Sequence, residues 1–217
     1  MMTADERTDS SRTADKTEEQ GLIRFGDFYA GMISGTCHID DLKAFLKKTG
    51  EIASETGVSV QGLNADMIAG RRHILFAVKR AAEAFETGRN GAKDRGLEIM
   101  RFASGQRQIE KAFQIGLFEG DVNCLFVLSG NSPDQIGAAE GLLSGLICVK
   151  GFDETVRPCE NREKQASFFS IGEDEIRAVS FEAETGKTGS GRSCPDIPAE
   201  LFEDLVIERV ALVDHTK

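Results

Sequence analysis

The chain has 217 residues, of which 40% are apolar, and a formal net charge of −10. This length predicts one domain with additions and a sizeable core, and the acidic balance argues against a general attraction to nucleic acid. The five cysteines form no CxxC pair and no signal peptide precedes them, which indicates a reduced, cytosolic protein. No apolar run reaches the roughly 18 residues of a membrane span, and the three histidines are not grouped with cysteines, so we expect neither a membrane segment nor a metal site.

Charge is distributed unevenly along the chain. Residues 64–111 contain ten lysines and arginines against six aspartates and glutamates, whereas residues 112–217 contain nine against nineteen. The chain is therefore acidic with one basic central block.

The first part of the chain predicts an acidic tail followed by alternating strands and helices. Residues 1–20 have almost no apolar content and are expected to be disordered. The elements predicted next are strand structure at 22–36, a helix at 40–56, a short strand at 58–63 and a helix at 67–85. Leu46 is expected on the inward side of the first helix, and Asp66 is expected to be the N-cap of the second.

The second part predicts a helical corner and then further mixed structure. The predicted elements are a loop at 86–96, two helices within 97–115, a strand at 122–128, a helix at 132–144 with Leu142 inward, and a short strand at 146–149. Periodicity is weak over 151–170. Residues 172–181 and 201–207 are expected to be helical, and residues 209–214 are expected to form a last strand.

These elements predict an α/β fold. We expect a single domain, residues 21–217, in which a mixed β-sheet is packed by several α-helices. Residues 182–199 contain five glycines and prolines and are expected to be a flexible insertion loop.

The predicted helix 67–85 carries a basic face with one aromatic residue. The residues on or near this face are Arg71, Arg72, His73, Phe76 and Lys79. Such a platform is typical of a surface that takes a base and its phosphates. Alternatives remain: Arg71 with a buried stem, Phe76 and His73 as ordinary surface residues, or a protein contact face.

The stretch Arg101-Phe102-Ala103-Ser104-Gly105-Gln106-Arg107-Gln108-Ile109 predicts two helices that meet at a Ser-Gly break. Arg101, Gln106 and Arg107 bring hydrogen-bonding groups to the end of a mostly apolar helix. They could bind phosphates or base edges there. The alternative is a corner whose arginines pair with nearby carboxylates, for example Arg101 with Glu98.

Catalytic patterns are missing from the sequence. There is no GxSxG or HExxH motif, the carboxylates are dispersed, and the histidines lie in separate segments. A convergent set of reactive groups is needed for catalysis, so we expect a protein that is not an enzyme and needs no cofactor.

Two stretches carry a resemblance to a known family. Leu63-Asn64-Ala65-Asp66-Met67-Ile68-Ala69-Gly70-Arg71-Arg72-His73-Ile74 and the Ser-Gly stretch resemble, in this order and spacing, the kinase-binding subunit of the KEOPS complex, the TPRKB-like family, in its archaeal form. Residues 206–212 are similar to the C-terminal segment of that family.

This resemblance implies a non-catalytic, cytoplasmic subunit in tRNA modification. KEOPS transfers a threonylcarbamoyl group to the adenosine next to the anticodon, on an ATPase-fold subunit that a small atypical kinase joins to this one. Archaeal members are implicated in holding the 3′ CCA end of tRNA. The residues expected to contact RNA are assigned by charge and position: Arg71, Arg72, His73, Phe76, Lys79, Arg101, Gln106 and Arg107. A protein-interaction adaptor without RNA contact remains the alternative.

Overall fold

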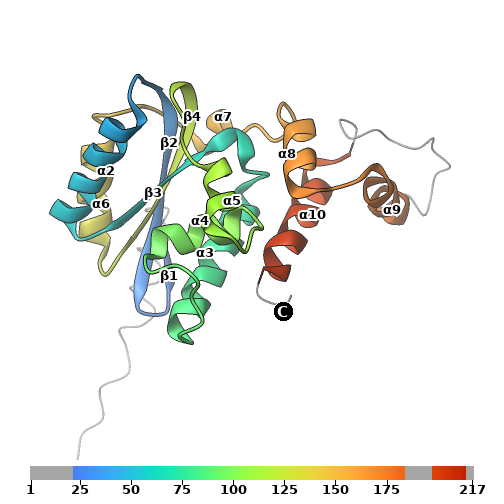
Figure 1. The fold of residues 1–217 in the computed structure, drawn as a ribbon, viewed down its shortest axis with the longest axis horizontal. Helices are drawn as coiled ribbons and strands as arrows, with labels where there is room; N and C mark the ends of the chain where they lie inside the picture. Colours follow the sequence, from blue (N-terminus) through green and yellow to red (C-terminus); the bar gives the residue numbers. More distant parts are fainter. Residues whose placement is uncertain (1–21, 184–196, 214–217) are drawn as a thin grey trace, which may run out of the picture.

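The computed structural model describes residues 22–183 and 197–213. Most of the predicted tail and of the insertion loop lies outside these residues. The centre of the fold is an antiparallel sheet in the order β1-β2-β4-β3, with β5 paired to β2 (Figure 1). Its strands are β1 (Ile23–Phe25), β2 (Phe28–Ile39), β3 (Ser59–Asn64), β4 (Gly120–Gly130) and β5 (Cys148–Lys150). The α/β fold with a sheet packed by helices is thus confirmed, but the sheet is antiparallel in all its described pairings and not mixed.

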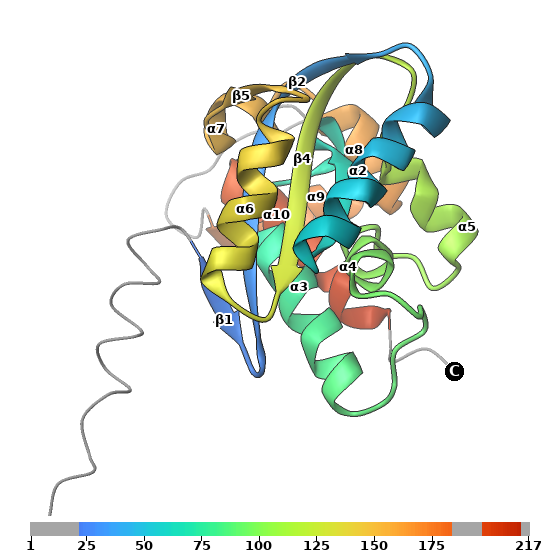
Figure 2. The same ribbon diagram turned by 90° about the vertical axis from the view of Figure 1, so that its left-hand side faces the viewer.

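Helices cover both faces of the sheet. α2 (Leu42–Thr56) and α6 (Pro133–Leu143) lie on one face, and α3 (Arg71–Glu86) and α4 (Arg95–Ala103) lie on the other (Figure 2). Successive side chains of β4 alternate between these layers: Phe126 packs with α2 and α6, and Leu125 and Val127 pack with α3 and α4. The sheet therefore has a hydrophobic core on each side.

The two helices on the first face lie close to their predicted bounds. The Asp41 side chain caps α2 by accepting the Ala44 N–H at 2.9 Å, and Gly57 ends this helix with a φ of 68°. The predictions for Leu46 and Leu142 were wrong, because their side chains are 49% and 41% exposed. In each helix the sheet-facing side is filled by other residues, such as Ile52 in α2.

The start of α3 differs from its prediction. Asp66 lies in a short 3-10 turn, η1 (Ala65–Met67), whose N-cap is Asn64, and α3 begins only at Arg71. The Asn64 side chain accepts the Asp66 N–H at 3.0 Å, and the Asp66 carboxylate accepts a hydrogen bond from Asn123 of β4 at 2.9 Å. Asp66 therefore ties the turn to the sheet instead of capping the helix.

The Ser-Gly corner joins α4 to a short helical segment. This segment consists of α5 (Ile109–Ala112) and the 3-10 turn η2 (Phe113–Ile115). The two predicted helices are therefore confirmed in position, but the second is shorter than expected.

The C-terminal part adds helices beside the layers around the sheet (Figure 1). They are α7 (Phe152–Thr155), α8 (Arg162–Phe169), α9 (Glu173–Ala183) and α10 (Ala199–Leu212). The predicted last strand at 209–214 was wrong, because α10 continues to Leu212. The β-branched residues there favour a strand, but Val206 and Val210 are spaced by one helical turn and both are buried. No helix among the described residues is long and apolar enough to cross a membrane.

Candidate nucleic-acid interface at the Ser-Gly corner

His73 joins the two sequence stretches in space. Its side chain is fully buried, its Nδ1 accepts the Ala69 N–H at 3.1 Å, and its Nε2–H donates to the Ala103 carbonyl at 2.8 Å. Burial lowers the pKa of His73 to about 4, so the imidazole is neutral at pH 7. His73 is therefore a structural link between α3 and the corner, and the prediction that it lies on an exposed face was wrong.

The sequence does contain a signal for this burial. His73 is in helical register with Ala77, Ala81 and Ala84, and all three alanines are buried. Because His73 lies on the same face of the helix as these alanines, it is expected to be buried.

The C-terminal helix α10 holds the beginning of α3. The Glu203 carboxylate, which is 7% exposed, accepts the His73 backbone N–H at 2.8 Å. A negative charge at a helix N-terminus is favourable because the first N–H groups of the helix have no partner within it. Gly70 makes room for this contact, since a Cβ at that position would lie 2.4 Å from Glu203 Oε1.

Arg72 takes part in the same docking. Its guanidinium donates to Asp204 of α10, and this hydrogen bond raises the pKa of Arg72. A predicted phosphate ligand is thus engaged by a carboxylate of its own chain. Glu203 and Asp204 could not be predicted as partners of α3 from the sequence, because nothing in their spacing shows which helix they contact.

Arg101 is buried at the end of α4. Its Nε and NH2 groups donate to the two oxygens of Glu98 at 3.1 and 2.5 Å, and the Glu98 side chain is fully buried. The same carboxylate accepts the backbone N–H groups of Gly91 and Ala92, at 3.2 and 2.8 Å. Arg101 is therefore part of the core, and the alternative that it pairs with Glu98 is confirmed.

The turn itself depends on Ser104 and Gly105. The Ser104 hydroxyl donates to the Arg101 carbonyl at 2.8 Å and accepts the Gln106 N–H at 3.2 Å. Gly105 has a φ of 62°, a conformation that favours glycine. A Cβ there would also lie 3.2 Å from the Cβ of Arg209 in α10, so the turn packs closely against the C-terminal helix.

Beyond the turn the chain is open to solvent. Gly105, Gln106, Arg107, Gln108 and Lys111 line a depression of about 580 Å³. Arg107, Gln108 and Lys111 are exposed and Gln106 is half-buried. This depression presents two positive charges and two amide side chains. Two predicted residues, Gln106 and Arg107, lie in it.

The other predicted residues on α3 lie in different surroundings. Arg71 is exposed, with its guanidinium 4.2 Å from the centre of the Phe152 ring of α7. Phe76 is half-buried and packs against the main core. Lys79 is exposed and its Nζ lies 4.0 Å from Glu83 Oε1. These contacts do not form the aromatic platform that was predicted, because Phe76 packs against the core and the ring beneath Arg71 is Phe152 of α7.

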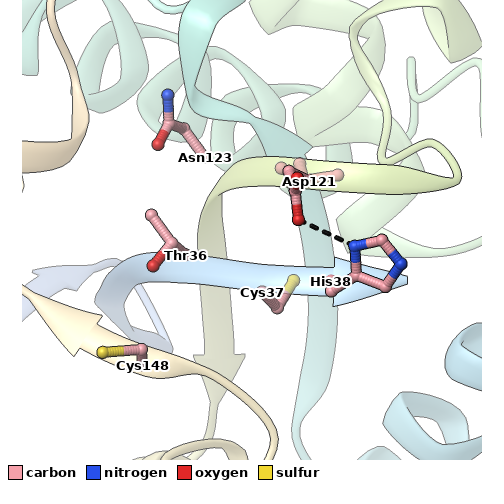
Figure 3. Close-up of a pocket in the computed structure, with 7 residues that line it drawn as sticks. Thr36, Cys37, His38, Asp121, Asn123 and Cys148 are labelled. Carbon is pink, nitrogen blue, oxygen red and sulfur yellow. Dashed lines mark hydrogen bonds and ion pairs between the residues drawn. The ribbon is translucent and has the colours of Figure 1, made fainter. Parts of the chain in front are cut away.

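A second depression, of about 490 Å³, lies at the C-terminal end of β2 and the N-terminal end of β4 (Figure 3). Thr36, Cys37, His38, Asp121 and Asn123 are among the residues that line it. His38 Nδ1 lies 2.7 Å from Asp121 Oδ1, and this contact raises the pKa of His38. The described residues contain no group of three His, Cys, Asp or Glu side chains that could hold a metal ion.

Comparison with known proteins defines the class of protein. The model of the family "Kinase binding protein CGI-121" matches residues 39–214, and the chain belongs to this family. The matched residues include both stretches that resemble the kinase-binding subunit, so that resemblance is confirmed.

Among curated proteins, the chain is similar to "Regulatory protein Cgi121" of Methanocaldococcus jannaschii. The two are 43% identical over 117 residues, which cover 46% of this chain and 77% of the relative. Both names describe a binding or regulatory role.

Proposed function

We propose that this protein is the non-catalytic, kinase-binding subunit of a KEOPS complex that forms threonylcarbamoyladenosine next to the anticodon of tRNA. In this role it binds the small atypical kinase of the complex directly. It is connected to the ATPase-fold transferase subunit only through that kinase, and it acts in the cytoplasm. The observation that carries the proposal is the family match over residues 39–214, which includes the two stretches joined by His73 and Ala103.

The kinase contact is proposed for apolar side chains near the corner and on the C-terminal helix. Phe113, just after α5, and Leu212, at the end of α10, are 54% and 53% exposed. Where a partner buries them, a few large apolar side chains can supply most of the binding free energy.

A pull-down with the purified kinase tests this contact. Phe113→Ser is expected to weaken kinase binding about tenfold or more, as loss of a central apolar contact does. Leu46→Ser is the matched control, because Leu46 is 49% exposed but lies on α2, which covers the other face of the sheet. Equal loss in both variants, or in neither, would place the kinase elsewhere.

The RNA contact is proposed for the depression at residues 105–111. The 3′ CCA end of a tRNA is single-stranded, and such RNA is recognised by hydrogen bonds to base edges and by charge at the phosphates. Gln106 and Gln108 supply amide groups, and Arg107 and Lys111 supply positive charge. A small cationic site is sufficient for a few nucleotides, even in a protein with a net charge of −10.

A gel shift with tRNA that has or lacks its CCA end tests this contact. The double variant Arg107→Ala, Lys111→Ala is expected to bind intact tRNA several-fold more weakly and to lose its preference for the CCA end. The control is Lys43→Ala, Lys48→Ala, which removes two exposed positive charges from α2. If the first variant keeps the affinity, the salt dependence and the CCA preference of the wild type, RNA is not bound in this depression.

A second candidate is an adaptor that regulates the kinase without contacting RNA. Two observations favour it: Arg101 is held by Glu98, and Arg72 is held by Asp204. Both arginines are used inside the fold, as this alternative requires. The two candidates differ in one result, since an adaptor captures the kinase but does not shift tRNA with or without its CCA end.

A further inference from the structure

Two thiols lie side by side on neighbouring strands. Cys37 of β2 and Cys124 of β4 have their sulfur atoms 3.9 Å apart. In the register of these strands, Cys37 is opposite Val122 and Cys124 is opposite Gly35. The two cysteines are therefore diagonal neighbours on one face of the sheet, the face that α2 and α6 cover.

The two thiols differ in exposure. Cys37 is half-buried and belongs to the lining of the depression in Figure 3, whereas Cys124 is fully buried. Cys124 also hydrogen-bonds through its sulfur to the Gly35 carbonyl at 3.4 Å. A small reagent from solvent consequently meets Cys37 first.

The pKa values of the two thiols also favour Cys37 as the first to react. The contact with the Cys124 thiol lowers the pKa of Cys37, while the same contact and burial raise the pKa of Cys124. Since the thiolate is the nucleophilic form of cysteine, Cys37 is the sulfur that reacts first with an oxidant.

We propose that Cys37 and Cys124 form a redox-reactive pair that a hydroperoxide converts into a reversible disulfide. The Cys37 thiolate attacks one oxygen of hydrogen peroxide, the O–O bond breaks, and Cys37 sulfenic acid and hydroxide are formed. The Cys124 sulfur then attacks the Cys37 sulfur, the S–O bond breaks, and the thiol proton and the hydroxyl leave as water. The two sulfur atoms are oxidised by two electrons in total, and the peroxide is reduced by the same two.

The bond requires the two cysteines to move closer together. A disulfide needs a sulfur separation of about 2.05 Å, so both side chains must move closer than the observed 3.9 Å. Diagonal positions on paired strands lie about 7–8 Å apart, whereas the Cα atoms of a disulfide are usually no more than about 6.8 Å apart, so the two strands must also shift toward each other. We therefore expect a strained disulfide that thiols reduce readily, which is the behaviour of a reversible modification.

The experiment isolates the pair in the full-length chain. Cys148→Ser, Cys159→Ser and Cys194→Ser are combined, which leaves only Cys37 and Cys124. After treatment with hydrogen peroxide at low excess, the intact mass is expected to fall by about 2 Da, the mass of two hydrogens, and dithiothreitol is expected to restore it. Peptide mapping is expected to show the peptides of Cys37 and Cys124 joined.

A further Cys124→Ser substitution is the matched control. In this variant Cys37 is expected to form a sulfenic acid that dimedone traps, with no cross-link. The same mapping on the wild-type chain, with all five cysteines present, covers the case in which the combined variant does not fold. The proposal is overturned if the mass rises by added oxygen in the presence of Cys124, if neither sulfur reacts, or if cross-links in the wild type join other cysteines.

Discussion

The two sides of the Ser104-Gly105 turn carry similar side chains in opposite environments. Before the turn, Arg101 is 6% exposed and is paired with a fully buried carboxylate. After it, Arg107 is exposed and lines an open depression. Two arginines that are close in sequence thus have unrelated roles, and burial decides which of them is available to a ligand.

On the buried side of the turn, before Ser104, the charged groups of Glu98 and Arg101 have several hydrogen-bond partners. Glu98 accepts hydrogen bonds from two groups of Arg101 and from the backbone of Gly91 and Ala92. A buried ion pair contributes little by itself, but removing one member leaves the other charged and without its partner in a medium that solvates it poorly. The contrast between buried Arg101 and exposed Arg107 can therefore be tested by measuring the free energy of unfolding of variants at the two positions.

The largest effect is expected for Arg101→Ala. The substitution leaves the Glu98 carboxylate buried without its counter-charge, and we expect the free energy of unfolding to fall by about 3–5 kcal/mol. Denaturant titration measures the loss. Arg107→Ala is the matched control and should stay within about 0.5 kcal/mol of the wild type, as surface substitutions do. Equal effects in the two variants would contradict the contrast between the two sides of the turn.

The next effect concerns pH and His73, which also belongs to the buried side. The pKa of His73 is lowered from 6.5 to about 4 in the folded chain, because burial disfavours the imidazolium. Above pH 6.5 both states are neutral and the contribution of His73 to stability is complete. As the pH falls from 6.5 toward 4, His73 becomes protonated in the unfolded chain but not in the folded chain. The contribution of His73 to the free energy of unfolding, about 3 kcal/mol in total, is therefore lost.

The variant His73→Gln isolates this component. We expect it to be less stable at pH 7 and to lose less stability than the wild type between pH 6.5 and 4, as measured by denaturant titration at each pH. His38→Gln is the control. The pKa of the exposed His38 is raised by Asp121, so its contribution is present at low pH and is lost as the pH rises. A wild-type pH profile in His73→Gln would show that His73 is not buried as a neutral ring.

Much of the fold could be predicted because it follows from local patterns. Alternation and helical spacing located the elements of the sheet and its covering helices, and residue types that favour helix ends, Asp41, Gly57 and Pro133, stand at the ends of α2 and α6. The errors came from contacts that are distant in sequence. Residues 209–214 have strand-like composition, but α3 supplies the surface on which α10, which continues to Leu212, packs as a helix.

The candidate site was predicted only in part for the same reason. Residue type and charge located the basic block, but they do not distinguish Arg101 from Arg107. Glu98, one turn before Arg101, was a signal for the internal pair. For Arg72 no such signal existed, because its partner Asp204 is on a helix that is remote in sequence.

A smaller effect is expected at the joint between α3 and α10. Gly70→Ala places a Cβ 2.4 Å from Glu203 Oε1, so the carboxylate must move away from the His73 N–H. We expect a loss of about 1–3 kcal/mol from this overpacking, together with the positive φ of Gly70, 157°, which favours glycine. Gly137→Ala is the control: Gly137 lies in the interior of α6 with nothing within 4 Å of the added Cβ, and it should be neutral or stabilising. A neutral Gly70→Ala would mean that α10 docks without the Glu203 contact.

The smallest effect on stability is expected on the exposed side, where the effect on binding is the informative one. Arg107→Ala combined with Lys111→Ala should change the free energy of unfolding by less than about 0.5 kcal/mol, since both side chains are exposed. If each contacts one phosphate, the slope of log affinity for tRNA against log salt should fall by roughly one per residue removed. A variant that loses stability instead would place these residues with Arg101 in the core. A variant that keeps both its stability and its salt slope would leave the turn with a structural role alone, because on its buried side Glu98 already holds Arg101 and His73 already holds the Ala103 carbonyl.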